Sequence, residues 1–154
     1  MQTPFLEMFK YNVCRDFRPD TDKVPKLMLT VLNGGKEMGS KVKFSKFYLV
    51  FNVKPEDMDT LDVHEAYFKL CASIEKSISA TKVGLAGFKR QVDGSYFNAF
   101  DNINDSFKLL EEAINQTGLQ QFIKIGINTD ASNWFNTETC LYEGDGPKDF
   151  KNSD

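Results

Sequence analysis

The sequence predicts an α/β domain whose elements follow the order strand, strand, helix, helix, strand. Short apolar runs bounded by turn or breaker residues predict strands at Lys26–Leu32, Phe47–Val53 and Phe122–Asn128, and the composition of the first two predicts burial on both faces. Two longer stretches carry apolar residues at spacings of three and four, which indicates amphipathic helices. With 154 residues, the chain is long enough for one domain with a core of its own.

The first two strands are separated by a glycine-rich loop. Asn33-Gly34-Gly35 ends the first strand, and glycine tolerates the positive φ that a sharp exit from a strand needs. The loop then carries Lys36 and Glu37. Since α/β proteins usually hold their binding and catalytic groups in loops that follow strands, this loop is the first place to look for a site.

Two helices are predicted after the second strand. The first runs from about Met58 to Ser79, and the segment Lys54–Asp57 before it supplies proline and acidic residues suited to a first turn. The second runs from about Ile103 to Asn115 and is ended by Gly118. Between them, Thr81–Asp93 has no sustained period and is predicted to be a loop. The apolar stripes comprise Val63, Tyr67, Leu70, Ile74 and Ile78 in the first helix, and Ile103, Phe107, Leu110 and Ile114 in the second.

Composition and charge exclude several classes of protein. Hydrophobic residues make up 41% of the chain, and the net charge of −3 gives no reason to expect nucleic-acid binding. No run of about 18 apolar residues occurs, so no membrane span is expected. The N-terminus resembles neither a signal peptide nor a transit peptide, and the three cysteines are spaced like free thiols. We expect an intracellular protein in a reducing compartment, most simply the cytoplasm.

Six segments of the chain match, in order, the motifs of one known family. They are Val24–Gly35, Val42–Phe51, Thr81–Val92, Phe107–Gly118, Phe122–Phe135 and, faintly, Leu141–Pro147. At near-correct spacing, these segments resemble the enolase family. The first contains the Asn-Gly-Gly that opens the enolase barrel, the second is similar to the strand with the Gln-Glu-Phe-Met motif, and the others follow in order to just past the third barrel strand.

The resemblance implies a partial enolase-type TIM barrel. It covers roughly a third of an enolase, whereas a closed eight-stranded α/β barrel takes about 250 residues. We therefore expect an N-terminal segment at 1–23, a truncated enolase-like barrel domain at 24–141 and an irregular tail at 142–154. Three strands leave sheet edges unpaired, so the fold is expected to be incomplete without partner chains.

The resemblance also implies where a catalytic site would lie. Enolases dehydrate 2-phosphoglycerate, with Mg²⁺ stabilising the ene-diolate intermediate. The substrate-contacting histidine of the family falls on Glu37, the glutamate of the Gln-Glu-Phe motif falls on Lys46, the acidic pair falls on Leu85 and Ala86, and a metal-ligand aspartate falls on Asn128.

These replacements predict that the enolase reaction is lost. Leu85 and Ala86 cannot protonate a leaving hydroxyl group. The neutral amide of Asn128 is a poor magnesium ligand, because Mg²⁺ prefers anionic oxygens. The remaining ligands and the catalytic lysine would lie on later strands, beyond this sequence. We expect no catalytic residue, no bound metal and no cofactor; Asp130 is the one candidate substitute ligand, since a shift of two residues keeps the same strand face.

Other polar groups admit a functional and a structural interpretation. Glu37 with Glu56 or Asp57 could form an acid–base pair, or these could be solvated charges. The lysines of the loop could bind an anion, or could form a solvated or partner-facing edge. His64 is expected on a helix surface, Cys71 within the packed helix face, and Trp134-Phe135 in a core or an interface rather than a ligand pocket. The lysine cluster comprises Lys36, Lys41, Lys43 and Lys46, interleaved with Phe44 and Phe47.

The functional hypothesis is a non-catalytic, enolase-like scaffold subunit of a larger assembly. The partner could be a second copy, giving a homo-oligomer, or another chain, and cytoskeletal, ciliary or organellar assemblies are compatible with the family analogy. The alternative is binding of Mg²⁺ and a phosphoglycerate with residual enolase (lyase) activity, including assembly with the remainder of a split enolase. The native mass and metal-dependent ligand binding discriminate between these hypotheses.

Overall fold

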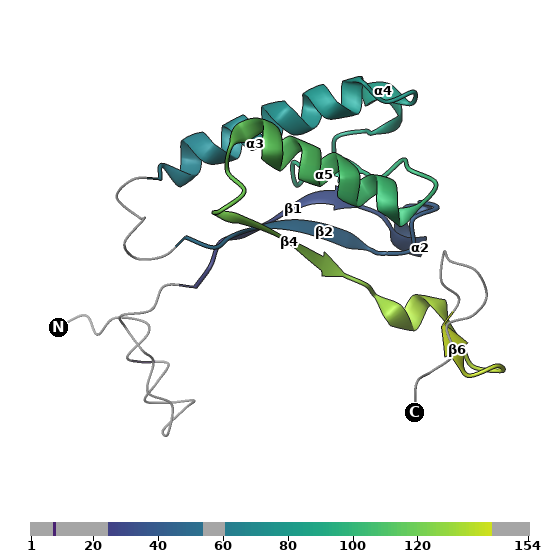
Figure 1. The fold of residues 1–154 in the computed structure, drawn as a ribbon. Coiled ribbons are helices and arrows are strands. Elements are labelled where there is room, and N and C mark those ends of the chain that lie inside the picture. The colour runs from purple at the N-terminus through teal and green to yellow at the C-terminus, as the bar shows by residue number, and fades with distance from the viewer. Residues whose placement is uncertain (1–7, 9–24, 54–60, 143–154) are drawn as a thin grey trace.

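The computed structural model describes Met8 and residues 25–53 and 61–142 (Figure 1). The expectations for the N-terminal segment, for Glu56 and Asp57 and for all of the tail after Tyr142 lie outside these residues. The elements in chain order are β1 (Met28–Asn33), α2 (Gly35–Met38), β2 (Lys46–Phe51), α3 (Val63–Ser79), α4 (Gly84–Gly87), β3 (Tyr96–Phe97), α5 (Ile103–Thr117), β4 (Ile123–Asn128), a 3₁₀ helix (Ala131–Trp134), β5 (Phe135–Asn136) and β6 (Leu141–Tyr142).

The predicted strands form one sheet with the order β3-β1-β2-β4. The central strand β2 pairs antiparallel with β1 and with β4, while the two-residue β3 pairs parallel with the end of β1, at Leu32 and Asn33. A register shift in the β1–β2 ladder lies between Thr30 and Leu32. The sheet is open within the described residues, which confirms the prediction of a partial barrel.

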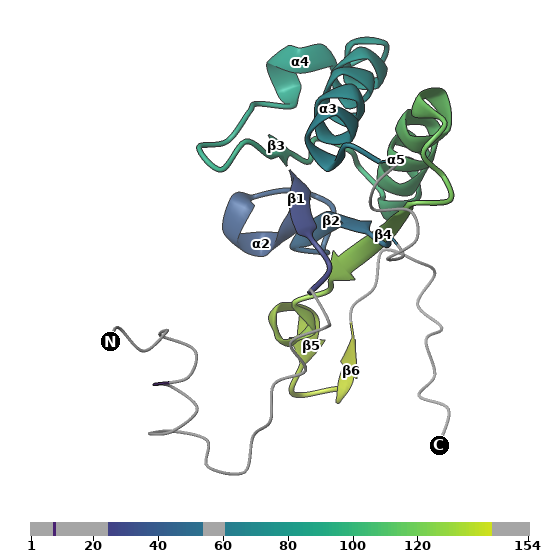
Figure 2. The ribbon, with the colours of Figure 1, turned by 90° about the vertical axis from the view of Figure 1, so that its left-hand side faces the viewer.

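Helices α3 and α5 cover one face of this sheet (Figures 1 and 2). Their apolar stripes pack against the side chains of β2 that point the same way, and this contact makes the hydrophobic core. Helix α5 ends as predicted, because Gly118 adopts the left-handed conformation, with φ of 72°. The fully buried large apolar side chains are Leu32, Val42, Phe47, Leu49, Leu70, Ile74, Ile78, Phe88 and Leu110.

Helix α3 begins later than the sequence predicts. Its first residue is Val63, and the Asp62 carboxylate before it accepts hydrogen bonds from the backbone amides of His64 and Glu65. These bonds satisfy amides of the first turn that have no partner within the helix, so Asp62 defines the start. Likewise, Thr81–Asp93 is not wholly a loop, since it contains the one-turn helix α4.

The strands are not buried on both faces. Along β2, Phe47, Leu49 and Phe51 are buried, whereas Tyr48 and Val50 are only half-buried. Met28, opposite Val50 on β1, is 55% exposed. The sheet thus has a covered face, toward α3 and α5, and an open face, which no described helix covers (Figure 2). The alternation of side chains in a pleated strand explains the pattern.

The 3₁₀ helix and the β5–β6 hairpin follow β4 (Figure 1). The Trp134 ring lies 5.7 Å from the ring of Phe44 and 5.7 Å from that of Tyr142. Trp134 is half-buried and Phe135 is 39% exposed, so this pair lies outside the core, and its expected place in an interface stays a prediction. Among the helices of the described residues, none is both long and apolar enough to cross a membrane.

Candidate functional site

The candidate site lies on the open face, where β1 and β4 end and β2 begins. The strand register places Asn33 of β1 opposite Lys46 of β2, and Lys46 opposite Asn128 of β4. Directly opposed residues of antiparallel strands have their side chains on the same face, with Cβ atoms about 5 Å apart. The fold therefore brings together two of the positions that the enolase resemblance singles out, Lys46 and Asn128.

An acidic residue that the sequence patterns do not single out also reaches this end of the sheet. Asp93 sits in the turn before β3, where its carboxylate Oδ1 accepts a hydrogen bond of 2.5 Å from the Ser95 hydroxyl. The amide Nδ2 of Asn33 donates to Ser95 Oγ at 2.7 Å and to Asp93 Oδ2 at 3.4 Å. The signal that could have found it is the sequence Asp93-Gly94-Ser95, a turn with φ of 84° at its glycine.

Asp93 is held in its charged form. The hydroxyl of Ser95 lowers the pKa of the Asp93 carboxyl group most, and the amide of Asn33 and the positive charge of Lys46 lower it further. Hydrogen bonds to a carboxylate and a nearby cation both favour ionisation. A carboxylate with a lowered pKa is a poor proton donor near neutral pH.

Leu85 and Ala86 lie elsewhere. They belong to α4, which packs beside α3 in the helical layer rather than on the open face (Figure 2). Leu85 is 48% exposed. Glu37 is exposed in α2, the single turn that follows β1. The structure therefore does not bring Leu85 or Ala86 to Lys46 and Asn128.

Asp130 does not take the place of a ligand at Asn128. Its backbone is left-handed, with φ of 48°, so the segment after β4 is not extended and the expectation of a shared strand face is wrong. The Asp130 carboxylate accepts a hydrogen bond of 2.5 Å from the Asn133 amide. Its own backbone N–H donates to Asn128 Oδ1 at 3.1 Å, the oxygen that a metal ion would need.

The residues on the open face do not fit the magnesium ion that the family resemblance implies. Asn33 and Asn128 are neutral amides, and Lys46 is a cation that repels a metal. The Asp93 carboxylate nearby already accepts hydrogen bonds from Ser95 and Asn33. Among the described residues, no group of three or more His, Cys, Asp or Glu side chains is placed to hold a metal ion. The donor set is therefore wrong for Mg²⁺.

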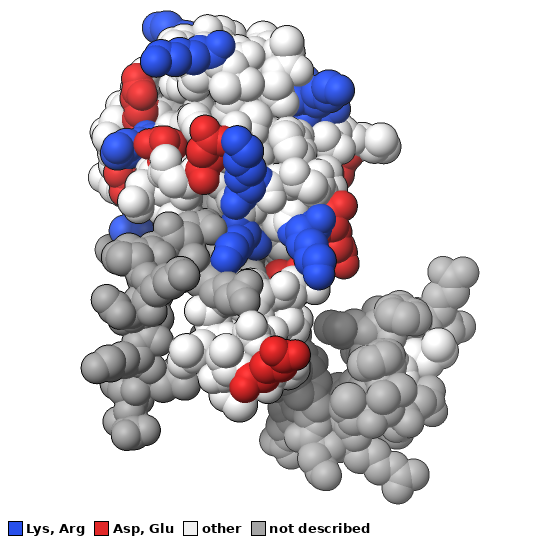
Figure 3. Space-filling model, turned by 90° about the vertical axis from the view of Figure 1, so that its right-hand side faces the viewer, with Lys and Arg blue, Asp and Glu red and all other residues white. Residues whose placement is uncertain are grey.

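Lys41, one of the lysines between β1 and β2, pairs with an acidic residue. Lys41 donates to Asp101 at 2.7 Å, and this hydrogen bond raises the pKa of the Lys41 ammonium group. Basic and acidic side chains are interspersed over the side of the molecule shown in Figure 3. Mixed charge of this kind gives no strong local field, which favours the solvated edge over the anion site.

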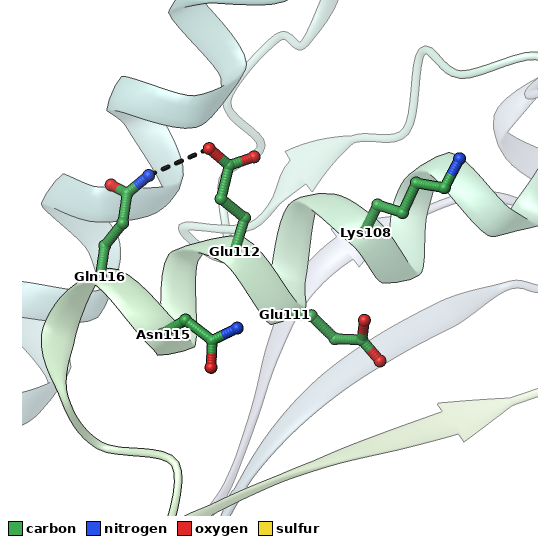
Figure 4. A pocket seen from close by; sticks show the side chains of 5 residues that line it. All are labelled: Lys108, Glu111, Glu112, Asn115 and Gln116. Carbon is green, nitrogen blue, oxygen red and sulfur yellow. Dashed lines mark hydrogen bonds between the residues drawn. The ribbon is translucent and has the colours of Figure 1, made fainter.

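A shallow hollow lies on the outer surface of α5. It is lined by Lys108, Glu111, Glu112, Asn115 and Gln116, all from this one helix (Figure 4). Gln116 Nε2 donates to Glu112 Oε1 at 3.1 Å. Because a single helix lines it and it opens widely to solvent, it lacks the enclosure of a ligand site.

His64 and the cysteines in the described ranges lie outside the candidate site. His64 is exposed on α3 as predicted, and its ring lies 4.7 Å from that of Phe68. Cys71 is half-buried within the α3 face, where burial raises the pKa of its thiol. Cys71 and Cys140, the two cysteines in the described ranges, are free thiols.

Comparison with known proteins bears out the resemblance. A family model described as "Enolase, C-terminal TIM barrel domain" matches residues 21–154. Enolase B of Dictyostelium discoideum is 32% identical over 131 residues, which cover 84% of this chain and 28% of that protein. An enolase of Metallosphaera sedula is 28% identical over 81% of this chain and 29% of its own length. An enolase of Saccharolobus islandicus is 27% identical over 92% of this chain and 32% of its own length.

The chain thus spans less than a third of the length of each of these relatives. The match runs through β1, β2, both long helices and β4, the elements that the sequence predicts for the first part of a barrel. This chain therefore belongs to the enolase family, and it corresponds to part of the C-terminal barrel domain.

Proposed function

We propose that this chain is a non-catalytic enolase-family unit that acts by binding another polypeptide at its open sheet. One observation carries the proposal: Lys46 and Asn128 lie side by side on the open face, at positions where the resemblance implies a catalytic glutamate and a magnesium-binding aspartate. A lysine and an amide there provide neither a proton-accepting carboxylate nor a cation site.

The neighbouring acidic group does not restore the chemistry. Asp93 is tied to Ser95 and Asn33, and these contacts keep the pKa of its carboxyl group low. A general acid works best with a pKa near the working pH, so a residue held as a carboxylate protonates a leaving group poorly.

Binding of a polypeptide is supported by the shape of the sheet. Strand β4 is the last strand of the sheet order, so its outer edge has no strand partner among the described residues. Met28, Tyr48 and Val50 supply apolar side chains on the open face. Unpaired edges and uncovered apolar surface are where a strand from another chain, or from more of the same chain, would add.

Calorimetry with Mg²⁺ and 2-phosphoglycerate tests the loss of catalysis. The proposal predicts no metal-dependent heat and no dehydration of 2-phosphoglycerate above the uncatalysed rate. The Dictyostelium enolase B, run in parallel, is the positive control. Metal-dependent binding at millimolar affinity or tighter, or turnover that survives repurification, would overturn the proposal in favour of a residual lyase.

The native mass of the protein in cell extract tests the binding function. We expect migration well above the mass of a single chain, with a partner or second copy that co-purifies. The predicted setting, a reducing cytoplasmic, cytoskeletal, ciliary or organellar assembly, is compatible with the free thiols at Cys71 and Cys140. Migration as a lone chain would contradict the proposal. Co-purification with a chain that bears the later barrel strands would favour a split enolase instead.

A further inference from the structure

The side chain of Asn33, at the end of β1, is only partly hydrogen-bonded. The residue is only 8% exposed, and its side-chain oxygen Oδ1 is buried without a hydrogen-bond partner among the residues that the structure describes, although its Nδ2 donates to Ser95 and Asp93. Buried polar atoms in folded proteins nearly always have a partner, and leaving one unpaired is costly. Asn33 Oδ1 is therefore able to accept a hydrogen bond from a neighbouring donor.

The side chain that can supply this donor is Lys46. It lies directly opposite Asn33 in the β1–β2 register, on the same face of the sheet, and it is exposed and long. Its ammonium group has three rotatable donors and no acceptor to satisfy. Its positive charge also helps to lower the pKa of the Asp93 carboxyl group, which accepts a hydrogen bond from Asn33 Nδ2 at 3.4 Å.

We propose that Lys46 is a latch, whose ammonium group donates to Asn33 Oδ1 and neutralises the Asp93 carboxylate, and so holds residues 93–98 against the end of β1. The ammonium group would thus take the place of a metal cation at this end of the sheet. It would compensate the charge of a carboxylate and donate a hydrogen bond to a neighbouring oxygen. This extends the proposed function, since it assigns a role to the lysine that stands where the resemblance implies a glutamate.

The latched segment connects the sheet to the helical layer. It carries β3, which pairs with β1, and the Asn98 backbone amide donates to the Asn33 carbonyl at 2.7 Å. The Asn98 side-chain amide donates to Ser106 Oγ of α5 at 2.8 Å. The backbone carbonyl of Asn98 accepts a hydrogen bond from the Ser40 hydroxyl at 2.7 Å. If Lys46 releases Asp93 and Asn33, this segment is expected to open locally more often.

Hydrogen exchange measured by mass spectrometry or NMR tests the latch. Lys46→Gln is expected to speed exchange at the amides of residues 96–98 by about tenfold, because one charge-assisted contact is lost. Lys46→Glu is expected to speed it further, since it places a second negative charge beside Asp93. Lys124→Gln, at another exposed lysine on the open face, is the matched control and should leave these amides unchanged. Equal exchange in Lys46→Gln and Lys124→Gln would overturn the proposal.

A charge swap separates the latch from a general packing role. The double variant Lys46→Glu/Asp93→Lys is expected to recover much of the protection that Lys46→Glu loses, which a packing role for the lysine stem would not produce. If Lys46→Glu does not fold, the effect of salt on hydrogen exchange serves as the test instead. Adding about 0.5 M salt should speed exchange at residues 96–98 more in the wild type than in Lys46→Gln, because the variant has no lysine charge at this position to screen. No recovery, or no difference in salt response, would refute the latch. Neither result affects the calorimetric test of catalysis, so the two proposals can fail separately.

Discussion

The two faces of the β1–β2–β4 sheet differ in what their side chains do. On the covered face, Phe47 has no exposed surface and its ring meets that of Phe107 at 5.5 Å, while Leu49 and Phe51 continue the same row into the core. On the open face, the neighbours of these residues are half-buried or exposed, and the row ends in Lys46. Residues that pack in the core and residues that face the candidate site thus alternate along the same strand. The site residues can therefore be replaced while the core packing is kept.

The largest effect is expected from the covered face. Phe47→Ala should cost about 3–5 kcal/mol of unfolding free energy, because it leaves a cavity beneath α5. Tyr48→Ala, one residue along and on the open face, should cost only about 1 kcal/mol. Urea unfolding of the two variants measures the difference. Equal losses would mean that the open face is packed as tightly as the covered one, and would break the comparison.

A buried network of hydrogen bonds surrounds Asn98, and its loss should give the second-largest decrease in unfolding free energy. Asn98→Ala removes the donor to Ser106 Oγ and the acceptor for the Phe100 amide, at a cost of about 2 kcal/mol. A double-mutant cycle with Ser106→Ala isolates the Asn98–Ser106 bond, and the two losses should not add. Additive losses would show that the bond contributes nothing.

Much of the covered face could be predicted from the sequence. The stripes of both long helices and the stop at Gly118 follow from local spacing and from the conformational freedom of glycine. The apolar content of the strands predicts their existence, although it overstates their burial. An apolar run alone does not tell how many faces are covered, because that depends on which elements pack on the sheet.

The candidate site was less accessible to prediction. Lys46 and Asn128 were singled out, and the register brings them together. Asp93 was not, because its contact with Asn33 joins residues 60 positions apart and depends on the turn at Gly94. The role considered for Asp130 depends on an extended backbone, and the left-handed conformation found there leaves no mark in hydrophobic spacing.

A smaller effect on stability is expected at the start of α5, one of the helices on the covered face. Asn102 caps α5, and its side-chain oxygen accepts from the Asp105 backbone amide at 3.0 Å. Asn102→Ala should cost about 1 kcal/mol of unfolding free energy through the lost cap. Asn104→Ala, at an exposed position that is the second residue of the same helix, should be close to neutral in the same thermal or urea melts. A cost at Asn104 as large as at Asn102 would contradict the capping role.

The smallest effect is expected from the pH dependence on the open side. Because the folded state lowers the pKa of Asp93, this residue adds stability above its unfolded pKa, and the contribution is lost as the pH falls through the folded pKa. Wild type should therefore lose a little more stability than Asp93→Asn between about pH 6 and pH 2. Urea midpoints at several pH values provide the comparison. Parallel curves would show that Asp93 is not held by its neighbours.

The most direct test of the central claim, that the open face no longer forms a cation site, is a magnesium titration followed by NMR at the backbone amides of Asn33, Lys46, Asp93 and Asn128. We expect no saturable shift of these four signals up to about 10 mM Mg²⁺, a concentration far above that at which a well-formed carboxylate site is filled. Saturable shifts confined to these residues would show that the open face still binds the metal, and would contradict the account.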